Sequence, residues 1–227
     1  MKSARTKLLS STKKRIFAQR LLSWFSANKV SFPWRETRNP YKILIAEMLL
    51  RKTTRKQVMK IFSEFIEKYP DVSSLKVAST NEIERIITTL GMEHQRAYLL
   101  KALAERLMAD FDGRIPLRYE ALLSLPGVGP YAANAVMCFC LDMKKPLVDT
   151  NVIRVVQRVF SFDSSKKRPR TDPKIWEFVS RLIPNGKASA FNLSLLDFAA
   201  VVCTPKNPKC SDCPLTGICD HHAEQFS

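Results

Sequence analysis

The sequence is poor in glycine and has no long apolar run. Only six of its 227 residues are glycine. Apolar residues recur at helical spacing along most of the chain, and no segment shows a convincing strand alternation. We therefore predict an all-α fold. No uninterrupted apolar stretch approaches about 18 residues, so we expect no membrane-spanning helix.

Acidic residues are scarce relative to basic ones. The chain has 37 Lys and Arg against 21 Asp and Glu, which gives a net charge of +16. The first 20 residues hold seven Lys or Arg and no acid, and they predict a mobile basic arm before a helix that begins near Thr12. A surplus of this size favours a polyanionic partner. A merely soluble basic protein is the alternative.

The N-terminus also lacks the apolar run and cleavage site of a secretory signal. We therefore expect a cytoplasmic protein. Six cysteines in such a chain suggest reduced thiols and a metal site, because disulfide frameworks belong to oxidising compartments.

Ten helices are predicted from periodicity and from proline and glycine positions. The first ends before Phe32, and the second opens at Pro40, where proline is tolerated. The others fit residues 54–68, 81–89, 94–110, 118–125, 131–141, 151–161, 173–183 and 188–202. Residues 164–174 predict an exposed basic loop, and the tail 203–220 has little helical pattern.

A glycine-rich turn, LPGVGPYAA from Leu125, joins two of these helices. Gly127 and Gly129 permit positive φ and close backbone approach. The amides of the turn and of the following helix N-terminus would then face a phosphate group. An ordinary helix–helix connector is the alternative.

Four cysteines lie within 17 residues near the C-terminus, with the spacing C-x6-C-x2-C-x5-C. Four thiolates at this density suggest an iron–sulfur cluster or a zinc ion, and the spacing alone does not choose between them. Cys138 and Cys140 are expected to be small core residues. The four cysteines of the motif are Cys203, Cys210, Cys213 and Cys219.

These motifs together resemble a known superfamily. The hairpin, the segment VDTNVIRV, the segment FNLSLLDFAAVVC and the cysteine spacing follow the order found in the helix-hairpin-helix DNA glycosylases, which include endonuclease III and mismatch adenine glycosylases. The resemblance covers about residues 15–220. The segments FPWRETRNPYKILIAEMLLRKTT, GMEHQRA and LPGVGPYAANAVMC are most similar to the archaeal thymine–guanine mismatch glycosylases.

The resemblance implies a two-lobed fold with a [4Fe–4S] cluster bound by the four cysteines. One lobe would be a six-helix barrel with the hairpin, at residues 33–143. The other would combine residues 1–32 and 144–227 and carry the cluster loop. The active cleft would lie between the lobes.

The resemblance also implies catalytic roles. Asp149 matches the catalytic aspartate, which stabilises positive charge on the sugar and can accept a proton from water; a simple helix cap is the alternative. Asn151 resembles a residue that orients this aspartate, or is a second cap. Glu47 matches a proton-donating glutamate, and its apolar neighbours could raise its pKa. A solvated surface glutamate is the alternative.

Tyr131 departs from endonuclease III, which has a lysine at this position. Tyrosine forms no Schiff base, so the resemblance predicts a monofunctional glycosylase that uses water. The aromatic ring could stack on or hydrogen-bond the flipped base, or it could simply be packed.

Further residues are expected to contact DNA. Lys52 resembles a residue that fills the hole left by the extruded base, and Met92 resembles an apolar wedge in the base stack. A phosphate-contacting lysine and a core methionine are the alternatives. Lys206 and Lys209, inside the cysteine loop, suit phosphate contact.

We therefore expect a monomeric enzyme, associated with the nucleoid, that acts on mismatched double-stranded DNA and removes thymine, and uracil as well, opposite guanine. An adenine glycosylase is the second hypothesis. Against it, residues 91–97 lack the paired tyrosines of that group, and the chain ends soon after Cys219, without the usual lesion-reading domain. A glycosylase–lyase is the third hypothesis, and a non-catalytic DNA-binding module is the fourth.

Overall fold

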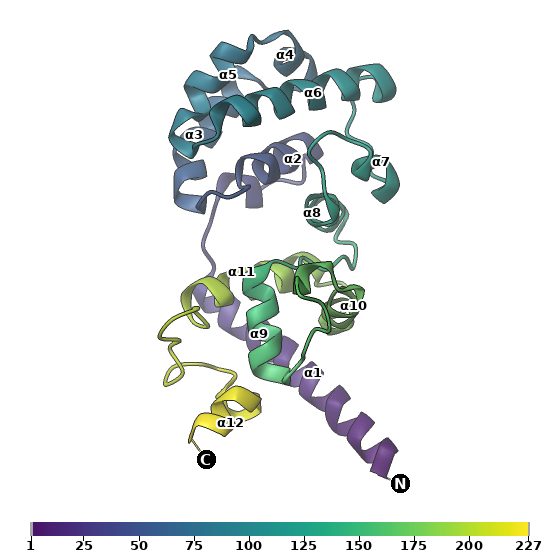
Figure 1. Ribbon diagram of the computed structural model, residues 1–227, viewed down its shortest axis with the longest axis vertical. Helices are drawn as coiled ribbons and strands as arrows, with labels where there is room; N and C mark the ends of the chain where they lie inside the picture. Colours follow the sequence, from purple (N-terminus) through teal and green to yellow (C-terminus); the bar gives the residue numbers. More distant parts are fainter. Residues whose placement is uncertain (1, 227) are drawn as a thin grey trace. The chain divides into compact units, whose positions relative to one another are not determined.

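The computed structural model describes the backbone of residues 2–226 and the side chains of residues 11–225. Every regular element in this part is helical (Figure 1), so the all-α prediction is confirmed. The chain divides into two compact units, residues 31–141 and residues 1–30 with 142–227. Both boundaries lie two residues from those predicted. No described helix is long and apolar enough to cross a membrane.

The unit of residues 31–141 is built around a buried helix. Tyr41, Leu44 and Met48 of this helix are almost fully buried, and it packs along the helix after the glycine-rich turn. The longest helix of the unit runs beside two short ones (Figure 1). The helices are α2 (Pro40–Leu49), α3 (Arg55–Lys68), α4 (Val72–Val77), α5 (Thr80–Ile87), α6 (Glu93–Phe111), α7 (Tyr119–Leu123) and α8 (Pro130–Leu141).

Local sequence signals determine where several of these helices begin. The Asn39 side chain accepts hydrogen bonds from the first-turn amides of α2, which opens with Pro40 at its first position. Thr54 and Gln57 cap α3 reciprocally, as Ser79 and Glu82 cap α5. These caps satisfy amides that no helical carbonyl can reach.

The second unit packs a long first helix against helices from the C-terminal half. Phe17 of the first helix is fully buried and makes edge-on contacts with Phe160 and Phe191. Trp24 meets Phe198 in the same way. These aromatic contacts join segments more than 140 residues apart into one core. The helices are α1 (Lys2–Asn28), α9 (Thr150–Phe160), α10 (Pro173–Leu182), α11 (Ala188–Val201) and α12 (Asp220–Phe226).

Three predictions about elements are wrong. α1 begins at Lys2, about ten residues before Thr12, and replaces the predicted basic arm. Residues 2–11 contain no proline or glycine, so charge alone does not stop a helix there. α4 and α12 were not predicted, because helices of six and seven residues show too little periodicity.

Candidate functional site

The glycine-rich turn joins α7 to α8, as predicted. Gly127 has φ +76°, and a Cβ at this position would lie 2.7 Å from Cε of Met48. Nη1 of Arg51 donates to the Gly127 carbonyl at 3.2 Å, which ties the turn to the end of α2. A Cβ on Gly129 would meet nothing within 4 Å. Gly127 is therefore required by the fold of its own unit, whereas Gly129 leaves open space on the outer side of the turn.

Asp149 is the N-cap of α9 and its carboxylate is held at both oxygens. Oδ1 accepts the backbone N–H groups of Asn151 (2.9 Å) and Val152 (2.7 Å). Oδ2 accepts Nδ2 of Asn151 at 3.1 Å. The carboxylate therefore caps α9 and is oriented by three hydrogen bonds, two of them from Asn151.

A half-buried arginine, missed in the sequence, supports Asn151. Arg154 lies one turn further along α9, and its Nη1 donates to Oδ1 of Asn151 at 3.0 Å. The same guanidinium donates to the carbonyls of Ala199 (2.8 Å) and Cys203 (2.9 Å). A chain of hydrogen bonds therefore runs from the Asp149 carboxylate to the backbone of the first cysteine of the motif. The i, i+3 spacing of Asn151 and Arg154 within VDTNVIRV was the only signal for it.

Glu47 lies near the end of α2, on the partly covered side of an otherwise buried helix. Removal of its carboxyl group from water raises the pKa of Glu47 to about 8, and the positive charge of Arg35 opposes this shift. At neutral pH Glu47 is therefore mainly protonated and can donate a proton. The surface-glutamate alternative does not fit this environment.

Tyr131 occupies the first turn of α8, directly after the glycine-rich turn. Its side chain is half-buried, and Ala133 and Asn134 beside it are buried. α8 packs along α2, so Tyr131 and Glu47 stand on neighbouring helices of one unit.

Lys52 and Met92 share an unusual backbone. Both have φ 55°, in the left-handed region that non-glycine residues seldom adopt, and both side chains are exposed. Such strain persists only where the surroundings enforce it. Exposure at 48% also shows that Met92 is no core methionine.

A buried arginine holds the two strained segments together. Arg96 is 6% exposed and donates to the carbonyls of Met48 (2.8 Å), Leu49 (3.2 Å) and Arg51 (3.0 Å), just before Lys52. It also reaches the carbonyl of Gly91 at 3.5 Å, just before Met92. Burial, and less strongly the charge of Arg51, lowers the pKa of Arg96. The sequence segment GMEHQRA contained this arginine, but nothing indicated its partners.

The four cysteines of the motif gather in the segment after α11. Among the described residues, no three His, Cys, Asp or Glu side chains are arranged to hold one metal ion. The thiols nevertheless lie within electrostatic range of one another. Burial is the main cause that raises the pKa of the Cys213 thiol to about 11, and charge on Cys203, Cys219 and Cys210 adds to it.

Donors around these thiols suit a thiolate cluster. Nη1 of Arg158 lies 3.4 Å from Sγ of Cys203, and the Leu215 amide donates to Sγ of Cys213 at 3.4 Å. Arg158 also donates to the carbonyls of Thr204 and Pro205. Four thiols within electrostatic range of one another, together with N–H donors to two of the sulfur atoms, are the residue types that would hold an iron–sulfur cluster. Lys206 and Lys209 are exposed in the same segment.

Comparison with known proteins identifies the family. The family model described as HhH-GPD superfamily base excision DNA repair protein matches residues 45–181. The chain belongs to the HhH-GPD superfamily. The iron–sulfur binding domain of endonuclease III also matches, at residues 203–219. This HhH-GPD protein therefore carries a [4Fe–4S] domain, and the zinc alternative is set aside.

Within the HhH-GPD superfamily, similar proteins extend over almost the whole chain. A thymine/uracil-DNA glycosylase of Pyrobaculum aerophilum is 48% identical over 202 residues, which are 88% of each chain. A thymine-DNA glycosylase of Aeropyrum pernix is 42% identical, over 90% of this chain and 93% of the relative. A solved structure of a thermostable thymine-DNA glycosylase superposes with a TM-score of 0.90 at 38% identity and covers 95% of this chain and 99% of that one.

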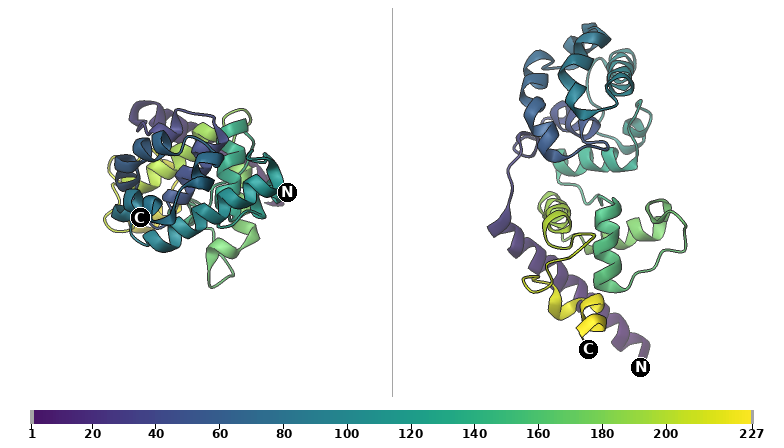
Figure 2. Two further views of the ribbon diagram at one scale, coloured as in Figure 1. Left: turned by 90° about the horizontal axis from the view of Figure 1, so that it is seen from above. Right: turned by 60° about the vertical axis from the view of Figure 1, so that its left-hand side comes forward.

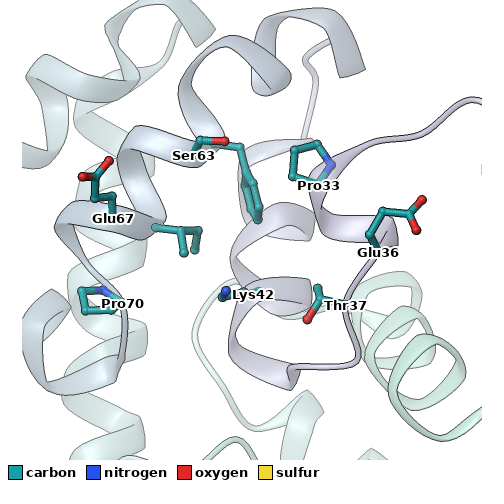
Figure 3. A pocket seen from close by; sticks show the side chains of 9 residues that line it. Pro33, Glu36, Thr37, Lys42, Ser63, Glu67 and Pro70 are labelled. Carbon is teal, nitrogen blue, oxygen red and sulfur yellow. The ribbon is translucent and has the colours of Figure 1, made fainter.

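A separate hollow of about 620 Å³ lies in the unit of residues 31–141 (Figure 3). Pro33, Lys42 and Pro70 contribute to its lining, with the carboxylates of Glu36 and Glu67 at its edge. None of the predicted site residues lines it. Two carboxylates at the edge also disfavour a phosphate ligand, so this hollow is distinct from the candidate site.

Proposed function

We propose that this protein is a monofunctional DNA glycosylase that hydrolyses the N-glycosidic bond of thymine, and of uracil, mispaired with guanine in double-stranded DNA. The single observation that carries the chemistry is the Asp149 carboxylate, fixed by three hydrogen bonds at the N-terminus of α9. The base preference is supported by relatives named thymine/uracil-DNA and thymine-DNA glycosylases.

The reaction replaces one bond by another at the sugar. The oxygen of water bonds to C1′ while the bond from C1′ to N1 of the base breaks. Positive charge grows on the sugar, and a carboxylate beside C1′ stabilises it and takes a proton from the attacking water. Asp149 is assigned this role, and Asn151 and Arg154 act as positioning residues.

Negative charge grows on the departing base. Glu47, with a pKa of about 8, is mainly protonated at neutral pH and is assigned the proton or hydrogen bond to a carbonyl oxygen of the base. Tyr131 is assigned contact with the extruded base. Because tyrosine supplies no amine, the product is an intact strand with an abasic site.

The remaining residues are assigned to DNA. The strained, exposed Lys52 and Met92 would fill the space left by the base and part the stack, at an extrusion cost of a few kcal/mol that is least at a mismatch. The turn at Gly127 and Gly129 and the exposed Lys206 and Lys209 would contact phosphates. Cys203, Cys210, Cys213 and Cys219 are assigned as ligands of the cluster, which shapes the loop that carries these two lysines. One lesion needs one copy of the chain, so we assign a monomer.

The test is release of free base from a panel of duplexes that contain T·G, U·G, A·G, and A opposite 8-oxoguanine, under single-turnover conditions. The proposal expects release from T·G and U·G, and strand breakage only after alkali. Release of adenine alone would favour an adenine glycosylase. Breakage without alkali, with a covalent adduct trapped by borohydride, would favour a lyase. Inactivity on every duplex would favour a DNA-binding module.

A further inference from the structure

The connection between α9 and α10 carries a cluster of cations that no proposed role uses. Lys166, Lys167, Arg168 and Arg170 are all exposed, and none makes an ion pair with a described acidic side chain. We call residues 161–172 the basic loop. Figure 2 draws it, in green, as an open loop that projects from the helices of its unit.

The basic loop is anchored at its base. Asp172 is 2% exposed, and its carboxylate accepts the Ser164 hydroxyl at 2.7 Å and the Lys174 amide at 3.0 Å. The indole N–H of Trp176 donates to the Arg170 carbonyl at 2.8 Å. The Thr171 amide closes a turn onto the Arg168 carbonyl. The four cations are therefore displayed on an ordered backbone.

Neighbouring charges reinforce the positive cluster. Lys14 of α1 lies 4.9 Å over the ring of Phe178 on α10, and Lys174 is exposed in the first turn of the same helix. Of the nearby acids, Asp172 is buried, and Glu177 pairs with Arg181. Asp163 alone remains as an exposed counter-charge in the loop. Like charges on neighbouring residues repel one another, and a bound polyanion relieves that repulsion.

The basic loop is separate from the Asp149 site. Asp149 caps the N-terminus of α9, and the basic loop leaves its C-terminus after Phe160. With a rise of about 1.5 Å per residue, these 11 residues set the two ends roughly 16 Å apart. A phosphate held by the basic loop is therefore remote from a nucleotide held at Asp149.

We propose that the basic loop, with Lys14 and Lys174, is a second DNA-binding surface that contacts the phosphate backbone of duplex DNA away from the excised base. Arginine and lysine side chains suit phosphate groups, the first as a planar fork and the second as a point charge. The aromatic ring of the loop, Phe162, packs against Phe178 in a tilted contact, with 4.8 Å between the ring centroids, and is not offered to a base. Backbone contact without base stacking favours a duplex over a single strand. This inference needs DNA as the partner, but it does not depend on which base is excised.

The test compares two variants of equal charge. One replaces Lys166, Lys167, Arg168 and Arg170 with Gln. The control replaces four exposed cations of the other unit with Gln, namely Lys60, Lys76, Arg85 and Arg114, for which no ion pair is seen. Affinity for an undamaged 30-base-pair duplex is measured across a series of salt concentrations, with thermal unfolding to check each fold. Base release at saturating enzyme is measured in parallel.

The proposal expects the basic-loop variant to bind undamaged duplex at least ten-fold more weakly than the control. The slope of log K against log salt concentration should be shallower by about 2–4 in this variant, because each lost phosphate contact lowers the magnitude of the slope by about 0.9. Single-turnover base release at saturating enzyme should stay unchanged. Equal affinity and equal salt dependence in the two variants would overturn the proposal. The proposal would also be overturned if the basic-loop variant lost binding to heparin or to anionic vesicles but still bound DNA as the control does.

Discussion

Asp149 illustrates how one side chain can serve the fold and the proposed chemistry together. Its carboxylate caps α9, and the second oxygen is held by Asn151, which in turn is held by Arg154. A carboxylate oriented from two sides loses little entropy when a sugar arrives, which is the advantage of preorganised catalytic groups.

Asn151→Ala should slow single-turnover base release by roughly 10–100-fold, because losing a hydrogen bond to a charged group costs about 1.5–3 kcal/mol. DNA affinity should change little. The control is Asn81→Ala, at an exposed site on α5. A variant that matched the control in rate would remove Asn151 from the positioning role.

Glu47 should make stability depend on pH. Burial raises its pKa from the ordinary glutamate value of 4.5 to about 8 in the folded chain. Between these values the folded protein keeps a proton that the unfolded chain releases, so the free energy of unfolding falls as pH rises from 4.5 to 8. Glu47→Gln should remove this decline. The gain in the free energy of unfolding of the variant over the wild type should therefore be larger at pH 8 than at pH 5, by about 1–3 kcal/mol.

Denaturant unfolding at pH 5 and pH 8 measures this effect. Glu64→Gln, at an exposed position on α3, provides the matched control. An unchanged pH dependence in Glu47→Gln would show that the carboxyl group is hydrated in the folded protein.

At the scale of elements, the hairpin between α7 and α8 contains one glycine that its own unit requires, Gly127, and one that we assign to DNA contact, Gly129. Gly127→Ala should destabilise the protein by about 1–3 kcal/mol, because of its φ of +76° and the 2.7 Å approach to Met48. Gly129→Ala should leave the melting temperature nearly unchanged but weaken DNA binding. Thermal unfolding and duplex titration of both variants measure this difference, and equal destabilisation by the two changes would contradict it.

Most helices were predictable because their signals are local. Apolar periodicity and prolines placed the start of α2 and both ends of α3 and of α5 through α11 within about two residues. The capping box of Asp71 and Ser74 at α4 was present in the sequence, but a helix of six residues shows too little apolar periodicity to be predicted. The predicted first helix was about ten residues shorter than α1, because the basic residues before Thr12 were interpreted as a mobile arm.

The site was predictable in part for the same reason. The hydrogen bonds between Asp149 and Asn151 join residues two apart, so a motif reveals them. Arg96 instead donates to a backbone carbonyl 48 residues away, and Arg154 to one 49 residues away. A backbone carbonyl has no sequence signature. Sequence motifs therefore do not reveal side chains that organise a site through backbone carbonyls.

At the scale of the whole molecule, the positive charge is distributed over several assigned surfaces. The net charge of +16 includes exposed lysines in the cysteine segment and the cations of the basic loop. α9 connects these parts, since Arg154 and Arg158 both bind the cysteine segment and Asp149 caps the same helix. Loss of the cluster should therefore disturb more than its own loop.

Replacement of any one of Cys203, Cys210, Cys213 and Cys219 by Ser should abolish stoichiometric iron, lower the melting temperature and weaken duplex binding, because the loop that bears Lys206 and Lys209 loses its support. The control is Cys140→Ala, at a buried position on α8. Iron analysis and thermal unfolding give readouts independent of activity. Full iron content in any of the four Ser variants would remove that cysteine from the ligand set.

The most direct measurement is single-turnover release of thymine from a T·G duplex by the wild-type protein and by Asp149→Asn, with strand integrity followed before and after alkali. The account predicts free thymine from the wild type, an intact strand until alkali is added, and a rate lower by at least about 10³ in Asp149→Asn, or about 4 kcal/mol of transition-state stabilisation. An Asp149→Asn rate within ten-fold of the wild type, or strand breakage without alkali, would contradict it.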